Sequence, residues 1–153
     1  KPLPKELRDG INRRAREEPL SPGAPWEVLS ILWQDSECVD DEGVYAGLIA
    51  ELAEVSGGLF KPEDITEKWN RKKEEIVVSF KHGGQTFRRA LDYQGDWLDP
   101  AVFELVNKAL AKSGTPMQFM PLPGEGQDFN IILTTPALMK AAQGKGLIPK
   151  PYV

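Results

Sequence analysis

The chain has 153 residues, a formal net charge of −4 and a sequence pI of about 5.1. Hydrophobic residues make up 41% of it and charged residues 27%, proportions that are typical of a globular protein and exclude wholesale disorder. The acidic balance disfavours general nucleic-acid binding, and no apolar run approaches the length of about 18 residues needed to span a bilayer.

The length predicts a single domain over residues 1–153, with a helical front over roughly 1–58 and a mixed back over roughly 59–153. In the front, apolar residues recur every four positions and predict a surface helix over Leu3–Glu18. A second helix is expected to begin at Pro25 and to end near Trp33, with the Trp33 side chain in the core. A third helix, with a broad apolar face, is expected to end near Val55, where two glycines follow.

The back of the chain changes to the alternating pattern of strands. Strands are expected near 76–80 and 86–93, joined by two glycines that suit a two-residue hairpin turn. This turn sets the register and places Phe80 opposite Phe87. Arg89 falls on the otherwise apolar side, which indicates that the core ends near it.

The segment 65–71 fits a strand or a helical turn, and the sequence does not decide between them. Further elements are expected in chain order: a helix begun by Asp99 and Pro100, strands near 117–120 and 129–133, and a last helix from Thr135 to about Gln143. The expected fold class is α+β, with N-terminal helices followed by a β-β-α-β-β-α unit that forms a mostly antiparallel sheet.

The chain has one histidine and one cysteine, which limits its chemistry. His82 is expected to be an ordinary, exposed turn residue, and the carboxylates around Cys38 disfavour a reactive thiolate. These two residues are too few for a zinc site. The acids between 35 and 42 lack the spacing of a calcium loop, and Asp40 to Glu42 are better explained as capping charge at the start of the following helix. We therefore expect no catalytic group, no metal and no cofactor.

The strongest remaining cluster consists of carboxylates around a tryptophan in a polar turn. Trp97 is expected to fold back over the start of the next helix, and the alternative is an exposed anchor at a protein interface. A loop rich in glycine precedes the 129–133 strand and adds polar groups. The predicted partner-contacting residues are Asp92, Asp96, Trp97, Asp99, Gln127 and Asp128.

These features favour a small non-catalytic protein-binding domain, of the kind found among bacterial inhibitors and toxin-immunity proteins. The expected partner is another protein with a basic surface, and neither nucleic acid nor membrane is expected to be one. The single cysteine favours a reducing, cytoplasmic location. Two alternatives stay open: a small enzyme or ligand-binding domain that uses the carboxylates around Trp97, or one domain of a larger protein.

Overall fold

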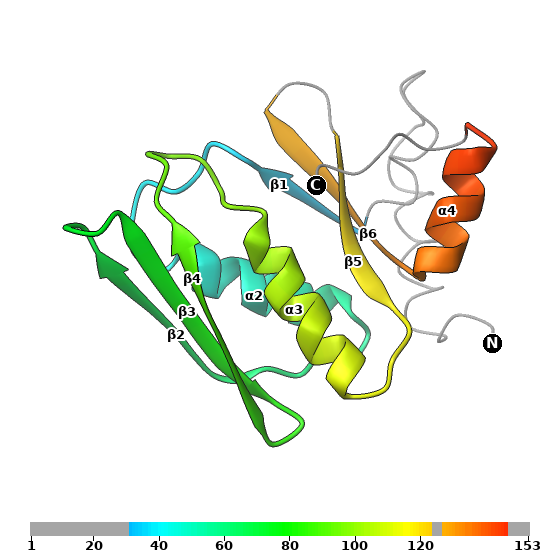
Figure 1. Cartoon of the computed structure of the whole chain (residues 1–153), viewed down its shortest axis with the longest axis horizontal. Coiled ribbons are helices and arrows are strands. Elements are labelled where there is room, and N and C mark those ends of the chain that lie inside the picture. The colour runs from blue at the N-terminus through cyan, green and yellow to red at the C-terminus, as the bar shows by residue number, and fades with distance from the viewer. Residues whose placement is uncertain (1–30, 124–126, 147–153) are drawn as a thin grey trace.

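A computed structural model describes residues 31–123 and 127–146 of the chain. The helix expected over Leu3–Glu18 and the first part of the helix expected from Pro25 lie outside the described residues. The described part is an α+β fold with six strands and three helices, and its strands form two separate antiparallel sheets (Figure 1).

The first sheet has the strand order β2-β3-β4 and the second has the order β1-β6-β5. The strands are β1 (Leu32–Asp35), β2 (Glu63–Asn70), β3 (Glu75–His82), β4 (Gln85–Asp92), β5 (Gln118–Pro123) and β6 (Asp128–Thr134). The helices are α2 (Val44–Val55), α3 (Ala101–Lys112) and α4 (Pro136–Gly144).

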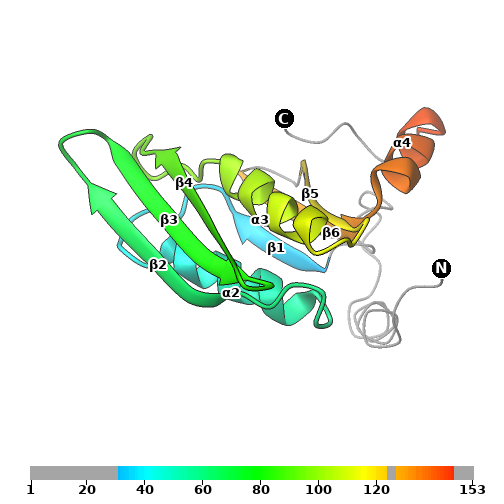
Figure 2. The same cartoon turned by 60° about the horizontal axis from the view of Figure 1, so that its bottom comes forward.

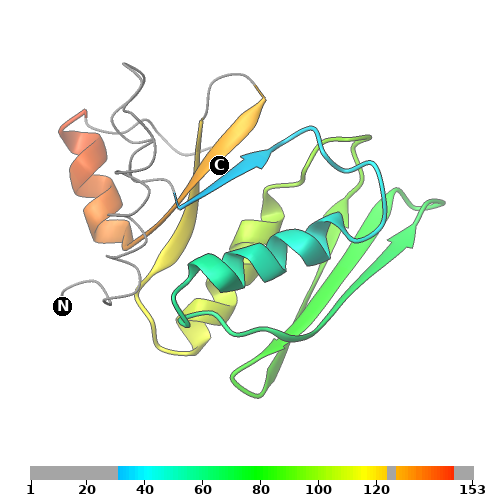
Figure 3. The same cartoon turned by 180° about the vertical axis from the view of Figure 1, so that it is seen from behind.

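Helix α3 explains why the strands do not form the one sheet that the sequence suggests. It contacts β4 on one side and β5 on the other, so the two hairpins are held apart (Figures 1 and 2). Helix α2 lies behind α3 and contacts β2, as the view from behind shows (Figure 3). One hydrophobic cluster extends from Val39 to Leu133 and includes side chains from both sheets and from both helices.

The β3–β4 hairpin has the predicted register. Phe80 pairs with Phe87, and their rings stack with centroids 5.7 Å apart. Gly83 and Gly84 have φ values of 56° and 75°, which the two-residue turn requires and which cost glycine little. Arg89 lies opposite Val78 on the inner face, as the register predicts.

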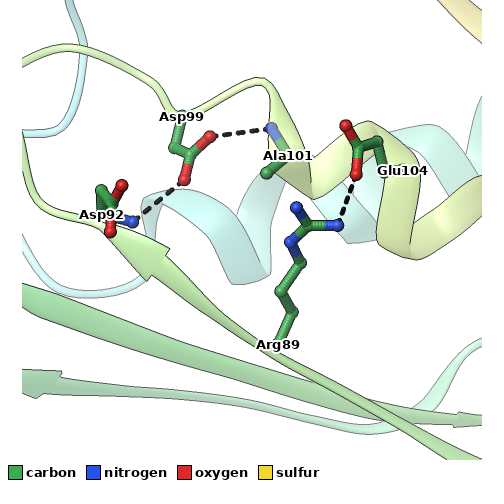
Figure 4. A network of polar contacts seen from close by, with 5 residues as sticks. All are labelled: Arg89, Asp92, Asp99, Ala101 and Glu104. Carbon is green, nitrogen blue, oxygen red and sulfur yellow. Dashed lines mark hydrogen bonds and ion pairs between the residues drawn. The ribbon is translucent and has the colours of Figure 1, made fainter.

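The guanidinium of Arg89 reaches helix α3. It donates to the Glu104 carboxylate at 2.6 Å, in a pair that is partly exposed (Figure 4). The charged side chain therefore lies at the rim of the core, between strand β4 and α3, and the sequence-based expectation about the core edge is confirmed.

The segment 65–71, which the sequence left undecided between a strand and a helical turn, lies largely in strand β2. A side chain of this strand also caps the start of helix α2. The Glu67 carboxylate accepts hydrogen bonds from the backbone N–H groups of Gly43 and Ala46, each at 3.0 Å. It also accepts one from Trp69 Nε1 at 2.6 Å. Asp40 to Glu42, which were expected to cap this helix, precede its N-cap Gly43, and none of them accepts a hydrogen bond from its first turn among the described residues. A negative charge from a neighbouring strand binds two of the N–H groups at the helix start instead, those of Gly43 and Ala46.

Two expectations about individual side chains are wrong. Residues 32–35 form strand β1, so the helix expected to reach Trp33 does not extend that far, and the Trp33 side chain is 52% exposed. His82 is only 8% exposed, because its ring packs on Phe60 with centroids 5.3 Å apart. The backbone N–H of Lys61 donates to His82 Nδ1 at 3.2 Å, which fixes the ring against the chain between α2 and β2.

The last helix has the predicted start. The Thr135 side chain accepts a hydrogen bond from the Leu138 N–H, and Pro136 occupies the first helical position. Met139 of α4 packs against Leu122 and Ile132 in a second, smaller hydrophobic cluster on the face of the β1-β6-β5 sheet that lies away from the main core. No helix in the described ranges is long and apolar enough to cross a membrane.

We expect Glu67→Ala to lower the free energy of unfolding by about 1–3 kcal/mol, because three donors lose their shared acceptor. Urea unfolding followed by circular dichroism measures this change. The control is Glu51→Ala, which removes an exposed carboxylate of the same type from α2 and should change stability by less than about 0.5 kcal/mol. Equal effects of both substitutions would contradict the capping role of Glu67.

Candidate functional site

Three segments that are distant in sequence meet at one end of the β1-β6-β5 sheet. Ser36, which follows β1, is 6% exposed, and its N–H and its hydroxyl both donate to the Gln127 carbonyl. The Ser36 carbonyl accepts from the Leu98 N–H at 2.7 Å, and the Val39 N–H donates to the Asp96 carbonyl at 2.7 Å. Backbone hydrogen bonds therefore hold the loop 94–99 and the start of β6 against the segment 36–39.

These contacts bring acidic and aromatic side chains together. Trp33 donates its indole N–H to Asp128, and Asp128 lies directly opposite Asp35 in the β1–β6 register. The Asp35 carboxylate accepts from the Glu37 N–H at 2.9 Å, and Glu37 forms an isolated β-bridge with Trp97. We call this continuous set the acid–tryptophan surface; its members are Trp33, Asp35, Glu37, Asp96, Trp97 and Asp128.

Both tryptophans of the acid–tryptophan surface are accessible. The side chain of Trp33 is 52% exposed and that of Trp97 is 41% exposed. Trp97 therefore does not form the buried plug that the sequence favours. Both rings are nevertheless attached to strand-like backbone, so they present large aromatic area with little loss of freedom on contact.

Basic side chains are absent from the sequence segments that build this surface. No lysine or arginine occurs within 31–60, 90–107 or 127–139. The ion pairs of the described residues join Lys81 to Asp64 and Arg89 to Glu104, and neither pair includes a member of the acid–tryptophan surface. The negative charge there is therefore not neutralised by a salt bridge from the described part of the chain.

Asp99, one of the six predicted contact residues, has a structural position. Its Oδ1 accepts from the Ala101 N–H at 2.8 Å and its Oδ2 from the Asp92 N–H at 2.9 Å (Figure 4). One carboxylate thus begins α3 and ties it to the end of β4. The helix itself starts at Ala101, so Asp99 caps it from two residues before its first residue.

The other predicted residues are divided between two places. Asp96, Trp97 and Asp128 belong to the acid–tryptophan surface, and Gln127 supports it through its carbonyl. Asp92 is exposed and lies opposite Glu75 in the β3–β4 register, on the face of the β2-β3-β4 sheet that points away from the core. The structure therefore brings four of the six residues together and leaves Asp92 and Asp99 elsewhere.

Sequence reasoning missed Trp33, Asp35 and Glu37 as members of the surface. They occupy every second position, which is the period of a strand. Because the two tryptophans at 26 and 33 have helical spacing, the sequence favoured a helix there. The alternation over four strand residues is too short to outweigh that spacing.

Burial raises the pKa of two titratable groups near the acid–tryptophan surface. The pKa of the Tyr45 hydroxyl is raised to about 12, chiefly because the group is withdrawn from water. Its oxygen accepts a hydrogen bond from the Asp99 N–H at 2.8 Å, which partly opposes that shift. Burial also raises the pKa of the Cys38 thiol, as do the nearby charges of Asp35 and Asp40. Cys38 is therefore a poor nucleophile at neutral pH.

The arrangement of acids does not resemble a metal centre. Among residues 31–123 and 127–146, no group of three or more histidine, cysteine, aspartate or glutamate side chains is placed to hold an ion. Comparisons of the chain with protein-family models, with curated proteins and with solved structures find no significant match. The candidate function therefore depends on the geometry and charge of this surface.

Asp99→Ala should lower the free energy of unfolding by about 1–2 kcal/mol, because the first turn of α3 and the end of β4 lose their common acceptor. Asp92→Ala is the matched control, since its carboxylate accepts no hydrogen bond from the described residues, and it should stay within about 0.5 kcal/mol. Chemical denaturation compares the two. If Asp92→Ala were the more damaging change, the assigned roles would be wrong.

The raised pKa of Tyr45 predicts a loss of stability in alkali. An ordinary tyrosine ionises near pH 10.0 and folded Tyr45 near 12, so between these values the unfolded chain binds fewer protons and unfolding becomes easier as pH rises. The free energy of unfolding of the wild type should therefore fall more steeply from pH 10 to 12 than that of Tyr45→Phe. Below pH 9 the variant should be the less stable protein by about 1 kcal/mol, because the Asp99 N–H loses its acceptor. Parallel slopes in alkali would contradict the prediction.

Proposed function

We propose that this protein is a non-catalytic protein-binding domain that contacts a partner with a basic surface through the acid–tryptophan surface. The observation that carries the proposal is the presence of two half-exposed tryptophans, Trp33 and Trp97, among carboxylates that form no salt bridge within the described residues. Tryptophan is the residue most enriched among energetic hot spots of protein interfaces.

The hydrogen bonding of the carboxylates supports this role. The carboxylates of Glu37 and Asp96 accept no hydrogen bond from the described residues, so their charge is available to a partner. A positively charged partner would be attracted over a distance of about 8–10 Å at physiological salt and oriented before contact. Contact with the two indole rings would then supply apolar burial.

The alternative of an enzyme built on Asp92, Asp96 and Asp99 has less support. Asp99 uses both carboxylate oxygens for backbone N–H groups, and the Asp92 side chain lies on the other sheet. A pair of carboxylates that acts on a glycosidic bond has to face the same reacting atoms. The arrangement favours contact with a surface over reaction at a point.

Within the class of protein-binding domains, the narrower proposal is an inhibitor or immunity-type protein that covers the basic functional site of its partner. We also propose a reducing, cytoplasmic compartment, because the single cysteine has no intramolecular partner with which to form a disulfide. The narrower proposal requires that binding remove the activity of the partner.

We expect the protein to bind cationic peptides in preference to anionic ones. The test uses an array of peptides of equal length and hydropathy with net charges of +4, 0 and −4, with fluorescence anisotropy as the measurement. The cationic peptides should bind most tightly, and the binding should weaken as salt rises. Equal binding across the array would remove the proposal.

A charge-matched pair of variants locates the interaction. Glu37→Gln with Asp96→Asn should weaken cationic-peptide binding about 2- to 30-fold, because each of the two partly exposed ion pairs contributes about 0.2–1 kcal/mol. Glu51→Gln with Glu54→Gln removes the same two charges from exposed positions of α2 and should leave affinity close to that of the wild type. If both double variants lose the same affinity, the attraction is a property of net charge alone.

A further inference from the structure

We propose that the Trp33 ring is a docking platform for an arginine side chain of the partner, with the carboxylates of Asp35 and Asp128 beside it. This inference rests on the proposed function, because it names the chemical group by which a basic partner is recognised. It goes further by assigning the anchor to the outer face of the β1-β6-β5 sheet, where Trp33, Asp35 and Asp128 alternate to the same side.

The hydrogen bonding of Trp33 determines which contacts its ring can still make with a partner. The indole N–H, which is the ring's only donor, is already given to Asp128. The ring is 52% exposed, so a partner can reach its π-face but has no free donor to contact. The π-face attracts cations. The chain contains one such contact of its own, since the Arg71 guanidinium lies 5.0 Å from the centre of the Trp69 ring.

The neighbouring carboxylates favour a cation over an apolar group. Asp35 and Asp128 are direct partners in the β1–β6 register, and like charges placed opposite each other across antiparallel strands destabilise the sheet. Asp128 Oδ1 is buried and has no hydrogen-bond partner among the described residues. A cation on the Trp33 ring would reduce the repulsion between the two carboxylates.

The shape of the platform favours arginine over lysine. A guanidinium is planar and stacks on an indole while its N–H groups donate sideways to carboxylates, whereas an ammonium is a compact, more strongly hydrated charge. Trp33 supplies the flat surface, and the Asp35 carboxylate supplies an acceptor on the same side of the sheet, with the negative charge of Asp128 directly opposite it. Trp97 lies beyond Glu37 and would contact a second part of the partner.

The test is a titration of the ¹⁵N-labelled full chain with two probe peptides, a glycine–serine peptide carrying three arginines and the same peptide carrying three lysines. The chain has four tryptophans, so its indole N–H signals can be followed individually by NMR, with Trp33→Phe and Trp97→Phe as assignment variants. We expect the arginine peptide to move the Trp33 signal and to bind about 2- to 5-fold more tightly than the lysine peptide.

Variants then separate the platform from general attraction. Trp33→Leu should remove the preference for arginine, while Trp97→Leu, which changes the other exposed indole, should keep it. Asp128→Asn should weaken binding of both peptides. The ¹⁵N spectrum of each variant shows directly whether the fold is kept, and Trp33→Tyr, which retains a π-face, should restore part of the preference.

The possible outcomes distinguish this inference from the proposed function. Equal affinity for the two peptides, or shifts at Trp97 without shifts at Trp33, would overturn the arginine platform while leaving a basic-partner surface intact. If neither peptide moves any signal and the cationic array also fails to bind, the proposed function itself is wrong.

Discussion

The hydrogen bonds of Ser36 are the contact on which the candidate surface depends. The two sheets share no strand pairing, and helices α2 and α3 lie between them. The buried Ser36 connects the two sides. Its amide and hydroxyl donate to the carbonyl of Gln127, which directly precedes β6, and its own carbonyl accepts from the N–H of Leu98, which lies just before α3. Buried polar groups of this kind are costly to leave unpaired, so the three segments are expected to move as a unit. Without this connection, the loop that carries Trp97 would not be held against the strand that begins at Asp128.

Several features of the acid–tryptophan surface are not explained by the stability of the isolated chain. Asp35 and Asp128 face each other across two strands, and Trp33 and Trp97 keep much of their apolar area in water. Each feature carries a cost, and neither is relieved by a basic neighbour within the described segments. Local conflicts with folding rules tend to occur where a surface has a function, because there the compensation comes from a ligand or partner. These features are the reason why we propose contact with another molecule at this surface.

Local rules predicted much of the fold, and long-range contacts decided the rest. The glycine turn and the apolar alternation were sufficient to give the β3–β4 register, and Thr135 with Pro136 correctly marked the start of α4. The division into two sheets could not be predicted, because it depends on where α3 packs. His82 was expected in water for a similar reason: its burial is supplied by Phe60, which is distant in sequence. In the candidate surface, the turn residues were found from composition. Trp33 and Asp35 were missed because β1 is recognisable only through its pairing with β6.

The acids of this chain perform two different tasks, and the hydrogen bonds accepted by each carboxylate distinguish them. Glu67 and Asp99 accept backbone N–H groups with both oxygens and hold the starts of α2 and α3. Glu37 and Asp96 accept no side-chain hydrogen bond from the described residues. In the sequence these residues all resemble solvated charge near turns, which explains why Asp99 was grouped with Asp96. A carboxylate whose oxygens are already bonded would have to release a helix in order to bind a partner, whereas one with free oxygens gives up only water. We therefore propose recognition for the acids that do not hold a helix start, and these lie beside the exposed tryptophans.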